Sequence, residues 1–115
     1  MKILVVSDDP NLRAGAEFAF SDDEEISLAT DSRDAWPKLD EATDVVVVDI
    51  QTGRAGGFNL TRDIRAANKL RDVPILMLLE RDQDRWLARQ AGADVARVKP
   101  LTASDLVSEI RSLTA

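Results

Sequence analysis

The feature that most constrains the fold is a series of short, uninterrupted apolar segments separated by longer stretches. Val45–Val48 is a run of valines closed by an acid, and Ile3–Val6 is a similar run. Runs of this kind are typical of strands that are buried on both faces, as in a parallel sheet. Pro74–Leu79 predicts a third strand, Val95–Val98 a fourth, and Ile26–Ala29 a short strand near an edge.

The stretches between the strands carry apolar residues at helical spacing, which predicts amphipathic helices. The last stretch opens with Thr102 three residues before Asp105, an acidic variant of the capping box. In residues 32–40, Pro37 removes a backbone donor and crowds the preceding turn, so we expect that helix to start late, kink or shorten. The predicted core stripes are Leu12, Ala16 and Phe20; Phe58, Leu60, Ile64 and Ala67; Leu87, Ala88 and Ala91; and Leu106, Ile110 and Leu113, with Phe18 also in or near the core.

Strands that alternate with helices in this way predict an α/β fold, a doubly wound, five-stranded parallel sheet with helices on both faces. The 115 residues fit a single domain, residues 1–115, since domains cluster at roughly 100–150 residues. No apolar segment approaches the roughly 20 residues that span a bilayer, so we expect no membrane contact. A net charge of -6 argues against direct binding to nucleic acid, which favours a basic surface.

The chain contains no His, Cys or Tyr. Without Cys there is no disulfide, thiolate metal site or Cys nucleophile, and a cytoplasmic location is the default expectation. Without His, both Ser-His-Asp catalysis and His-ligated metals are excluded. Any metal would therefore be bound by oxygen atoms.

Charged residues follow the ends of the predicted strands, where open parallel sheets bind their ligands. They are Asp8, Asp49 and Glu80, with Lys99 after the last strand. Neighbouring carboxylates repel one another unless a cation joins them, and hard oxygen ligands are typical of a Mg²⁺ site. A lysine opposite them could meet an anion, so the set favours phosphoryl chemistry with Asp49 as the nucleophile. Taken singly, Asp49 could only cap a loop, and Lys99 could only form a surface ion pair.

Several motifs follow one another in a fixed order and spacing. They are Lys2–Pro10, Asp44–Asp49, Gly57 eight residues beyond Asp49, Phe58–Arg65, Pro74–Leu78, Ala91–Asp94 and Lys99–Leu101. At these residues the sequence resembles the receiver domain of two-component response regulators, over essentially its whole length. The resemblance implies the flavodoxin-like (βα)5 receiver fold.

The resemblance also implies a site. Asp49 would accept a phosphoryl group from the phosphohistidine of a histidine kinase or phosphotransfer protein, and Lys99 would contact the phosphoryl oxygens. Mg²⁺ would be held by Asp8, Asp49 and the backbone carbonyl of Gln51, while Pro100 would follow Lys99 in a cis peptide bond. The domain would catalyse at most its own phosphorylation and dephosphorylation, and would signal through a downstream protein partner or self-association.

Four positions depart from the receiver pattern. Ser7 stands where the family has the first member of an acid pair, which weakens the expected metal site, although a hydroxyl can hold a metal-bound water. Leu79 replaces the family's Thr or Ser, and Ala96 replaces its Tyr or Phe, so both moving parts of the usual switch are missing. Glu80 replaces a small residue, where its carboxylate would repel phosphate or pair with Lys99; it could also be only a solvated loop acid.

Trp86 has two interpretations. It could be a core anchor of the fourth long helix, but Leu87, Ala88 and Ala91 already supply an inward stripe. Its indole would then lie on the surface. With Arg85, Arg89 and Arg97, it would form a cationic, aromatic patch of the composition typical of interface hot spots.

Three functions compete. The first is a phosphorylatable receiver module. The second is a degenerate receiver that acts as a phosphorylation-independent interaction domain, which Ser7, Leu79, Glu80 and Ala96 favour. The third is a small phosphohydrolase with Asp49 as its nucleophile; it is disfavoured because Gln51 stands where a second acid would be expected.

Overall fold

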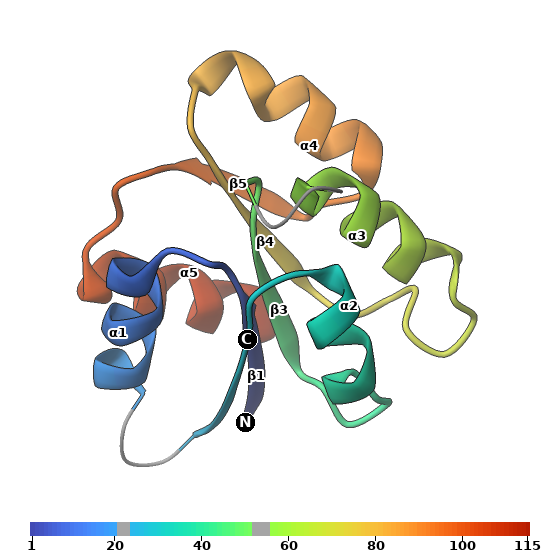
Figure 1. Cartoon of the computed structure of the whole chain (residues 1–115), viewed down its shortest axis with the longest axis horizontal. Helices are drawn as coiled ribbons and strands as arrows, with labels where there is room; N and C mark the ends of the chain where they lie inside the picture. The colour runs from blue at the N-terminus through green and yellow to red at the C-terminus, as the bar shows by residue number, and fades with distance from the viewer. Residues whose placement is uncertain (21–23, 52–55) are drawn as a thin grey trace.

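The computed structural model describes residues 1–20, 24–51 and 56–115, and strands and helices alternate along it (Figure 1). The strands are β1 (Lys2–Val6), β2 (Glu25–Ala29), β3 (Val45–Asp49), β4 (Ile75–Leu79) and β5 (Val95–Val98). The helices are α1 (Pro10–Ala19), α2 (Ser32–Ala35), α3 (Gly56–Ala66), α4 (Arg85–Ala91) and α5 (Ala103–Thr114), with short 3-10 helices η1 (Trp36–Lys38) and η2 (Asp82–Asp84).

The strands form one 5-stranded parallel sheet in the order β2-β1-β3-β4-β5, which confirms the predicted α/β fold. The chain passes from β1 to β2 on one side and then returns to β3 on the other, so the strand order reverses between β1 and β3. Val6 pairs with Val48, and Asp49 pairs with Leu78. The carboxyl ends of β1, β3 and β4 therefore meet at one edge of the sheet, at the switch point where such folds bind ligands.

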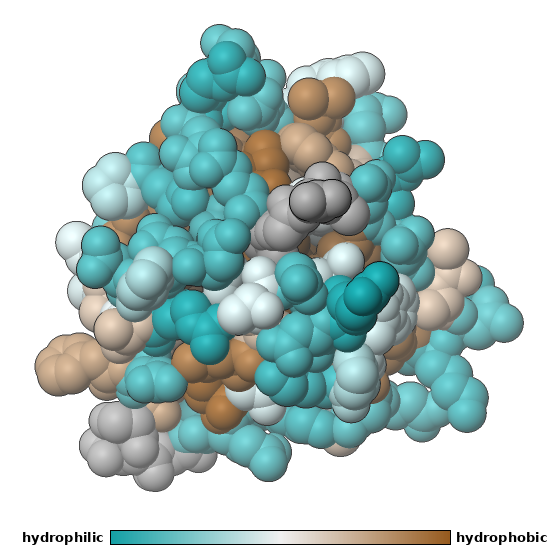
Figure 2. Space-filling model, viewed as in Figure 1, coloured by the Kyte–Doolittle hydropathy of each residue, from teal (hydrophilic) through white to brown (hydrophobic). Residues whose placement is uncertain are grey.

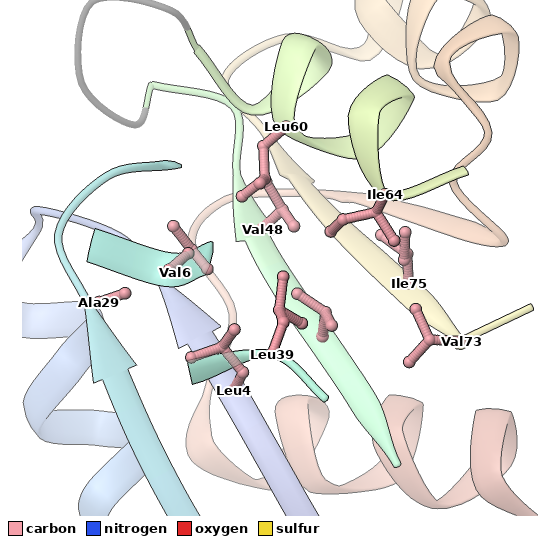
Figure 3. Packing of buried hydrophobic residues seen from close by; sticks show 11 residues of the cluster. Leu4, Val6, Ala29, Leu39, Val48, Leu60, Ile64, Val73 and Ile75 are labelled. Atoms are coloured by element: carbon pink, nitrogen blue, oxygen red, sulfur yellow. The ribbon is translucent and has the colours of Figure 1, made fainter. Parts of the chain in front are cut away.

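Successive side chains of each strand enter cores on opposite faces of the sheet, because side-chain direction alternates along a strand. One core lies under α2 and α3, as Figure 3 shows, and includes Leu4, Val6, Val46, Val48, Leu60, Ile64 and Ile75. The other lies under α1 and α5 and includes Ile3, Val5, Ala16, Val45, Val47, Leu106 and Ile110. The helices therefore cover both faces of the central strands, whose apolar residues are buried.

The second helix is short, as Pro37 predicts. Regular α-helix ends at Ala35, and η1 begins at Trp36 with the proline in its first turn, where a missing N–H costs no hydrogen bond. The Asp31 side chain caps the start by accepting a hydrogen bond from the Asp34 N–H at 2.9 Å. Trp36 is partly buried and packs against the core beneath this irregular segment.

Two predicted core residues are on the surface instead. Phe18 is 78% exposed, because it lies two residues from both Ala16 and Phe20, which face the sheet, and therefore points to the opposite side of α1. Leu87 is 45% exposed, because Ala88 and Ala91 alone form the buried side of α4.

The face of the molecule in Figure 2 is largely hydrophilic, with small, separate hydrophobic areas between charged side chains. Across the residues that the structure describes, none of the helices is long and apolar enough to cross a membrane.

Candidate functional site

Asp49 is the last residue of β3 and lies at the switch-point edge of the sheet. It is 1% exposed, although a carboxylate is one of the groups least often buried in proteins. Burying a charge is costly unless it is paired and hydrogen-bonded. The surroundings of Asp49 meet that requirement.

Neighbouring groups in the described part of the chain donate hydrogen bonds to the two oxygens of Asp49. The Ser7 hydroxyl donates to Oδ2 at 2.8 Å, and the Gln51 backbone N–H donates to Oδ1 at 3.1 Å. Lys99 Nζ lies 2.9 Å from Oδ1 and 3.0 Å from Oδ2. An ionised carboxylate offers about four lone-pair sites, so these contacts compensate the charge and fix the orientation of the group.

Lys99 is positioned by the backbone at the end of β5. Its N–H donates to the Leu79 carbonyl at 2.8 Å, and the Lys99–Pro100 peptide bond is cis, as the resemblance implied. The ammonium also contacts Glu80 Oε1 at 2.6 Å. Burial favours a lower pKa for Lys99, but the hydrogen bonds to Glu80 and Asp49 outweigh it and raise the pKa above its usual value.

Gly57 allows α3 to approach the site closely. A Cβ atom at this position would lie 2.7 Å from the Asp49 carbonyl oxygen and 2.7 Å from Val48 Cγ1, well inside van der Waals contact. The Gly57 N–H also donates to the Ile50 carbonyl at 3.0 Å. The start of α3 therefore packs directly on the backbone that carries Asp49, and this explains why the motif has glycine at this position.

In the loop after β1, some polar residues form hydrogen bonds within the protein and others are exposed to solvent. Asp9 caps α1, since its side chain accepts from the Asn11 N–H at 2.9 Å, and its own N–H donates to the Ser7 hydroxyl at 3.0 Å. Arg13 Nη1 donates to the Ser7 carbonyl at 3.0 Å and holds the loop. Asp8 is exposed, one residue beyond the serine that contacts Asp49.

The candidate metal ligands are few. No cluster of three or more His, Cys, Asp or Glu that could hold an ion occurs within residues 1–20, 24–51 and 56–115. The oxygen donors at this edge nevertheless suit Mg²⁺, which is commonly bound through one or two carboxylates and keeps several of its waters. Asp49 ends β3 and Asp8 follows β1, the neighbouring strand, so both carboxylates belong to this edge.

The positions of the usual switch belong to an apolar cluster. Leu79 is fully buried with Met77 and Ala88, and Ala96 packs against them. On the outer side, Arg85 Nη1 donates to the Ala96 carbonyl at 2.6 Å, a contact that the sequence did not reveal. Leu79 therefore extends the core, and α4 is tied to β5 by a guanidinium.

The predicted surface patch is present in part. Trp86 is 64% exposed beside Leu87 on α4. Two of the arginines are paired within the chain, Arg85 with Asp82 and Arg97 with Glu109, while Arg89 is exposed. Because of these pairs, the patch carries less free positive charge than its composition suggests.

The fold agrees with the comparisons with known proteins. A family model described as the response regulator receiver domain matches residues 3–111. The chain belongs to this family. One relative of this chain is the response regulator MprA of Mycolicibacterium vanbaalenii. The two sequences are 32% identical over a region that covers 98% of this chain and 50% of MprA. The transcriptional regulatory protein CpxR of Klebsiella pneumoniae is 29% identical over a region that covers 97% of this chain and 48% of CpxR.

Solved receiver structures have the same fold. The chemotaxis response regulator CheY4 of Vibrio cholerae has a TM-score of 0.89 and 26% identity, with 97% of each chain covered. The receiver domain of the sensor histidine kinase PA1611 from Pseudomonas aeruginosa PAO1 has a TM-score of 0.86 and 26% identity, over 98% of this chain and 96% of its own. That structure has a magnesium ion coordinated in the active site cleft. This chain spans about half the length of the curated relatives MprA and CpxR.

Proposed function

We propose that this receiver domain accepts a phosphoryl group on Asp49 from the phosphohistidine of a histidine kinase or phosphotransfer protein. The observation that carries the proposal is the buried carboxylate of Asp49 with Lys99 Nζ 2.9 Å and 3.0 Å from its oxygens. A fixed carboxylate can act as a nucleophile, and an ammonium beside it can neutralise the charge of an incoming phosphoryl group. The donor histidine has to belong to another molecule, since this chain contains none.

In the proposed transfer, an Asp49 oxygen bonds to phosphorus while the bond from phosphorus to the donor's imidazole nitrogen breaks. The electron pair of the broken bond stays on the nitrogen. Positioning and charge stabilisation dominate such transfers. Ser7 orients the Asp49 carboxylate through its hydroxyl, and Lys99 supplies positive charge beside it. The domain would catalyse only its own phosphorylation and dephosphorylation.

We propose Mg²⁺ as the cofactor. Its ligands would be the carboxylates of Asp8 and Asp49 and the backbone carbonyl of Gln51, with a water held by Ser7. The magnesium ion in the PA1611 receiver supports this assignment. When bound, the ion would supply positive charge that stabilises the negative charge of the phosphoryl group during transfer.

The proposal is tested by incubating the protein with Mg²⁺ and acetyl phosphate and measuring its intact mass. We expect a gain of one phosphoryl group that is lost in Asp49→Asn and when EDTA replaces Mg²⁺. Asp72→Asn, which changes an exposed acid before β4, should retain the gain. An unchanged mass of the wild-type protein at saturating Mg²⁺ would contradict the proposal.

A second candidate is a degenerate receiver whose output is phosphorylation-independent binding of a protein partner or of itself. The specific observation in its favour is Leu79, fully buried where the family has a hydroxyl that follows the phosphoryl group. Under this alternative, affinity for the partner would be the same for wild-type and Asp49→Asn protein. Under the first candidate, affinity would depend on phosphorylation of Asp49.

A further inference from the structure

Lys99 lies between two carboxylates that come from the ends of neighbouring strands. Its ammonium is 2.9 Å and 3.0 Å from the oxygens of Asp49 and 2.6 Å from Oε1 of Glu80. A lysine ammonium has three N–H donors and no more. The contacts with Asp49 and Glu80 are therefore enough to use every donor of Lys99.

The two carboxylates are not equally able to leave. Asp49 is 1% exposed and is also held by Ser7 and the Gln51 N–H, whereas the Glu80 side chain is 38% exposed. Moving Glu80 away from Lys99 would transfer its carboxylate into water, where the charge is well solvated. Moving Asp49 would break several hydrogen bonds to a buried charge. Glu80 is therefore the partner that Lys99 can exchange.

The charge of the cluster makes the exchange necessary. Asp49 and Glu80 together carry two negative charges against the single positive charge of Lys99. A phosphoryl group would add further negative charge beside Glu80, and like charges at this range disfavour one another. The ammonium would also need a free donor to contact a phosphoryl oxygen.

We propose that Glu80 is an internal competitor of the phosphoryl group, which occupies Lys99 in the resting domain and has to release it before Lys99 can contact a phosphorylated Asp49. This inference rests on the proposed function of Asp49. In this role Glu80 is a positioning residue that slows acquisition of a phosphoryl group. Its contact with Lys99 also keeps the unmodified site ordered.

The test compares wild-type protein with Glu80→Gln, which keeps the size of the side chain and removes its charge. Asp72→Asn is the matched control, since it removes the same charge at the opposite end of β4. Beryllofluoride with Mg²⁺ serves as a non-covalent phosphoryl mimic, and its affinity is measured by calorimetry. The side-chain ¹⁵N signal of Lys99 reports the ion pair without any phosphate present.

We expect Glu80→Gln to bind beryllofluoride about 1.5- to fivefold more tightly than wild type, the range that loss of one partly exposed ion-pair partner allows. Phosphorylation by acetyl phosphate should accelerate by a similar factor, and the Lys99 signal should shift. Asp72→Asn should match wild type in all three measurements. Thermal unfolding of each variant checks that the fold is retained.

The failures can be told apart. Equal or weaker beryllofluoride binding by Glu80→Gln, in a protein that acetyl phosphate still modifies at Asp49, would overturn the role of Glu80 alone. An unchanged Lys99 signal in Glu80→Gln would do the same, because the ion pair would then not exist in solution. If neither wild-type nor Glu80→Gln protein gained a phosphoryl group, the proposed function would fail and this inference with it.

Discussion

The hydroxyl of Ser7 donates a 2.8 Å hydrogen bond to Asp49 from the neighbouring strand end. Ser7 is itself completely buried, and its oxygen also accepts the Asp9 N–H at 3.0 Å. At this position a carboxylate would face Asp49 directly and repel it. The serine therefore gives this receiver domain a site that is satisfied without a metal ion.

Ser7→Asp should make the fold depend on Mg²⁺. Without the ion, a second carboxylate beside buried Asp49 should lower the free energy of unfolding by about 1–3 kcal/mol, because like charges repel in a poorly solvated site. With Mg²⁺, the added ligand should recover that loss. Urea unfolding with and without Mg²⁺ measures both values.

Ser7→Ala distinguishes the effect of the added carboxylate in Ser7→Asp from the effect of losing the serine hydrogen bond. It should cost about 1–3 kcal/mol, because a hydrogen bond to a charged group disappears, but it should show no added response to Mg²⁺. If Ser7→Asp and Ser7→Ala responded equally to Mg²⁺, the new carboxylate would not be a ligand.

Gly57→Ala should disturb the site through the backbone. Its Cβ would meet both the Asp49 carbonyl oxygen and Val48 Cγ1 at 2.7 Å, so α3 or the end of β3 has to move. We expect a loss of about 1–3 kcal/mol in the free energy of unfolding, the usual cost of overpacking, and slower phosphorylation by acetyl phosphate.

The matched control is Gly15→Ala in α1, where a Cβ would meet nothing within 4 Å. Gly15→Ala should stabilise the protein by up to about 1 kcal/mol. Equal effects of the two substitutions would contradict the close approach at Gly57.

Leu79→Thr tests whether the switch position has become part of the core. Threonine would place a hydroxyl and a smaller side chain in the fully buried cluster with Met77 and Ala88. We expect a loss of about 2–4 kcal/mol, from a lost apolar volume and a poorly paired hydroxyl. Leu79→Met, which nearly conserves volume, should cost less than about 1.5 kcal/mol. A nearly neutral Leu79→Thr would mean that the site still accommodates the hydroxyl of the family's switch.

The strands, their parallel arrangement and the cis peptide bond after Lys99 were predictable, because apolar runs and family motifs are local or have fixed spacing. The shortening of the second helix followed from Pro37 in the same way. Phe18 is exposed although an aromatic side chain favours the core, and its position two residues from Ala16 is the sequence signal against a buried position. The assignment of Leu87 failed because α4 is buried only along Ala88 and Ala91.

Within the site, the sequence placed Asp49, Lys99 and Glu80 at one edge but could not say which pairs form. Lys99 contacts both carboxylates. This double contact depends on how far β4 and β5 extend past one another and on the conformations of the side chains. The bond from Ser7 to Asp49 could have been inferred from the register, in which Val6 pairs with Val48 and the next residues therefore face one another. The link from Arg85 to the Ala96 carbonyl had no comparable signal.

The last prediction concerns pH and the opposite edge of the sheet. The Lys2 ammonium lies 2.6 Å from Asp40 Oδ2, and this hydrogen bond, with one from the Ala42 N–H, lowers the pKa of Asp40 below its usual 3.8. A carboxyl with a depressed folded-state pKa stabilises the fold above its unfolded-state pKa. That stabilisation is lost as pH falls below 3.8 through the folded value.

Asp40→Asn should therefore flatten the acid limb of a plot of unfolding free energy against pH, and should have a smaller slope than wild type below pH 3.8. Lys2→Met should flatten the same limb, because it removes the main cause of the shift. Glu24→Gln, which removes the same negative charge from a partly exposed position, is the control for the change in net charge. Parallel acid limbs for wild-type and Asp40→Asn protein would show that the contact with Lys2 is not maintained in solution.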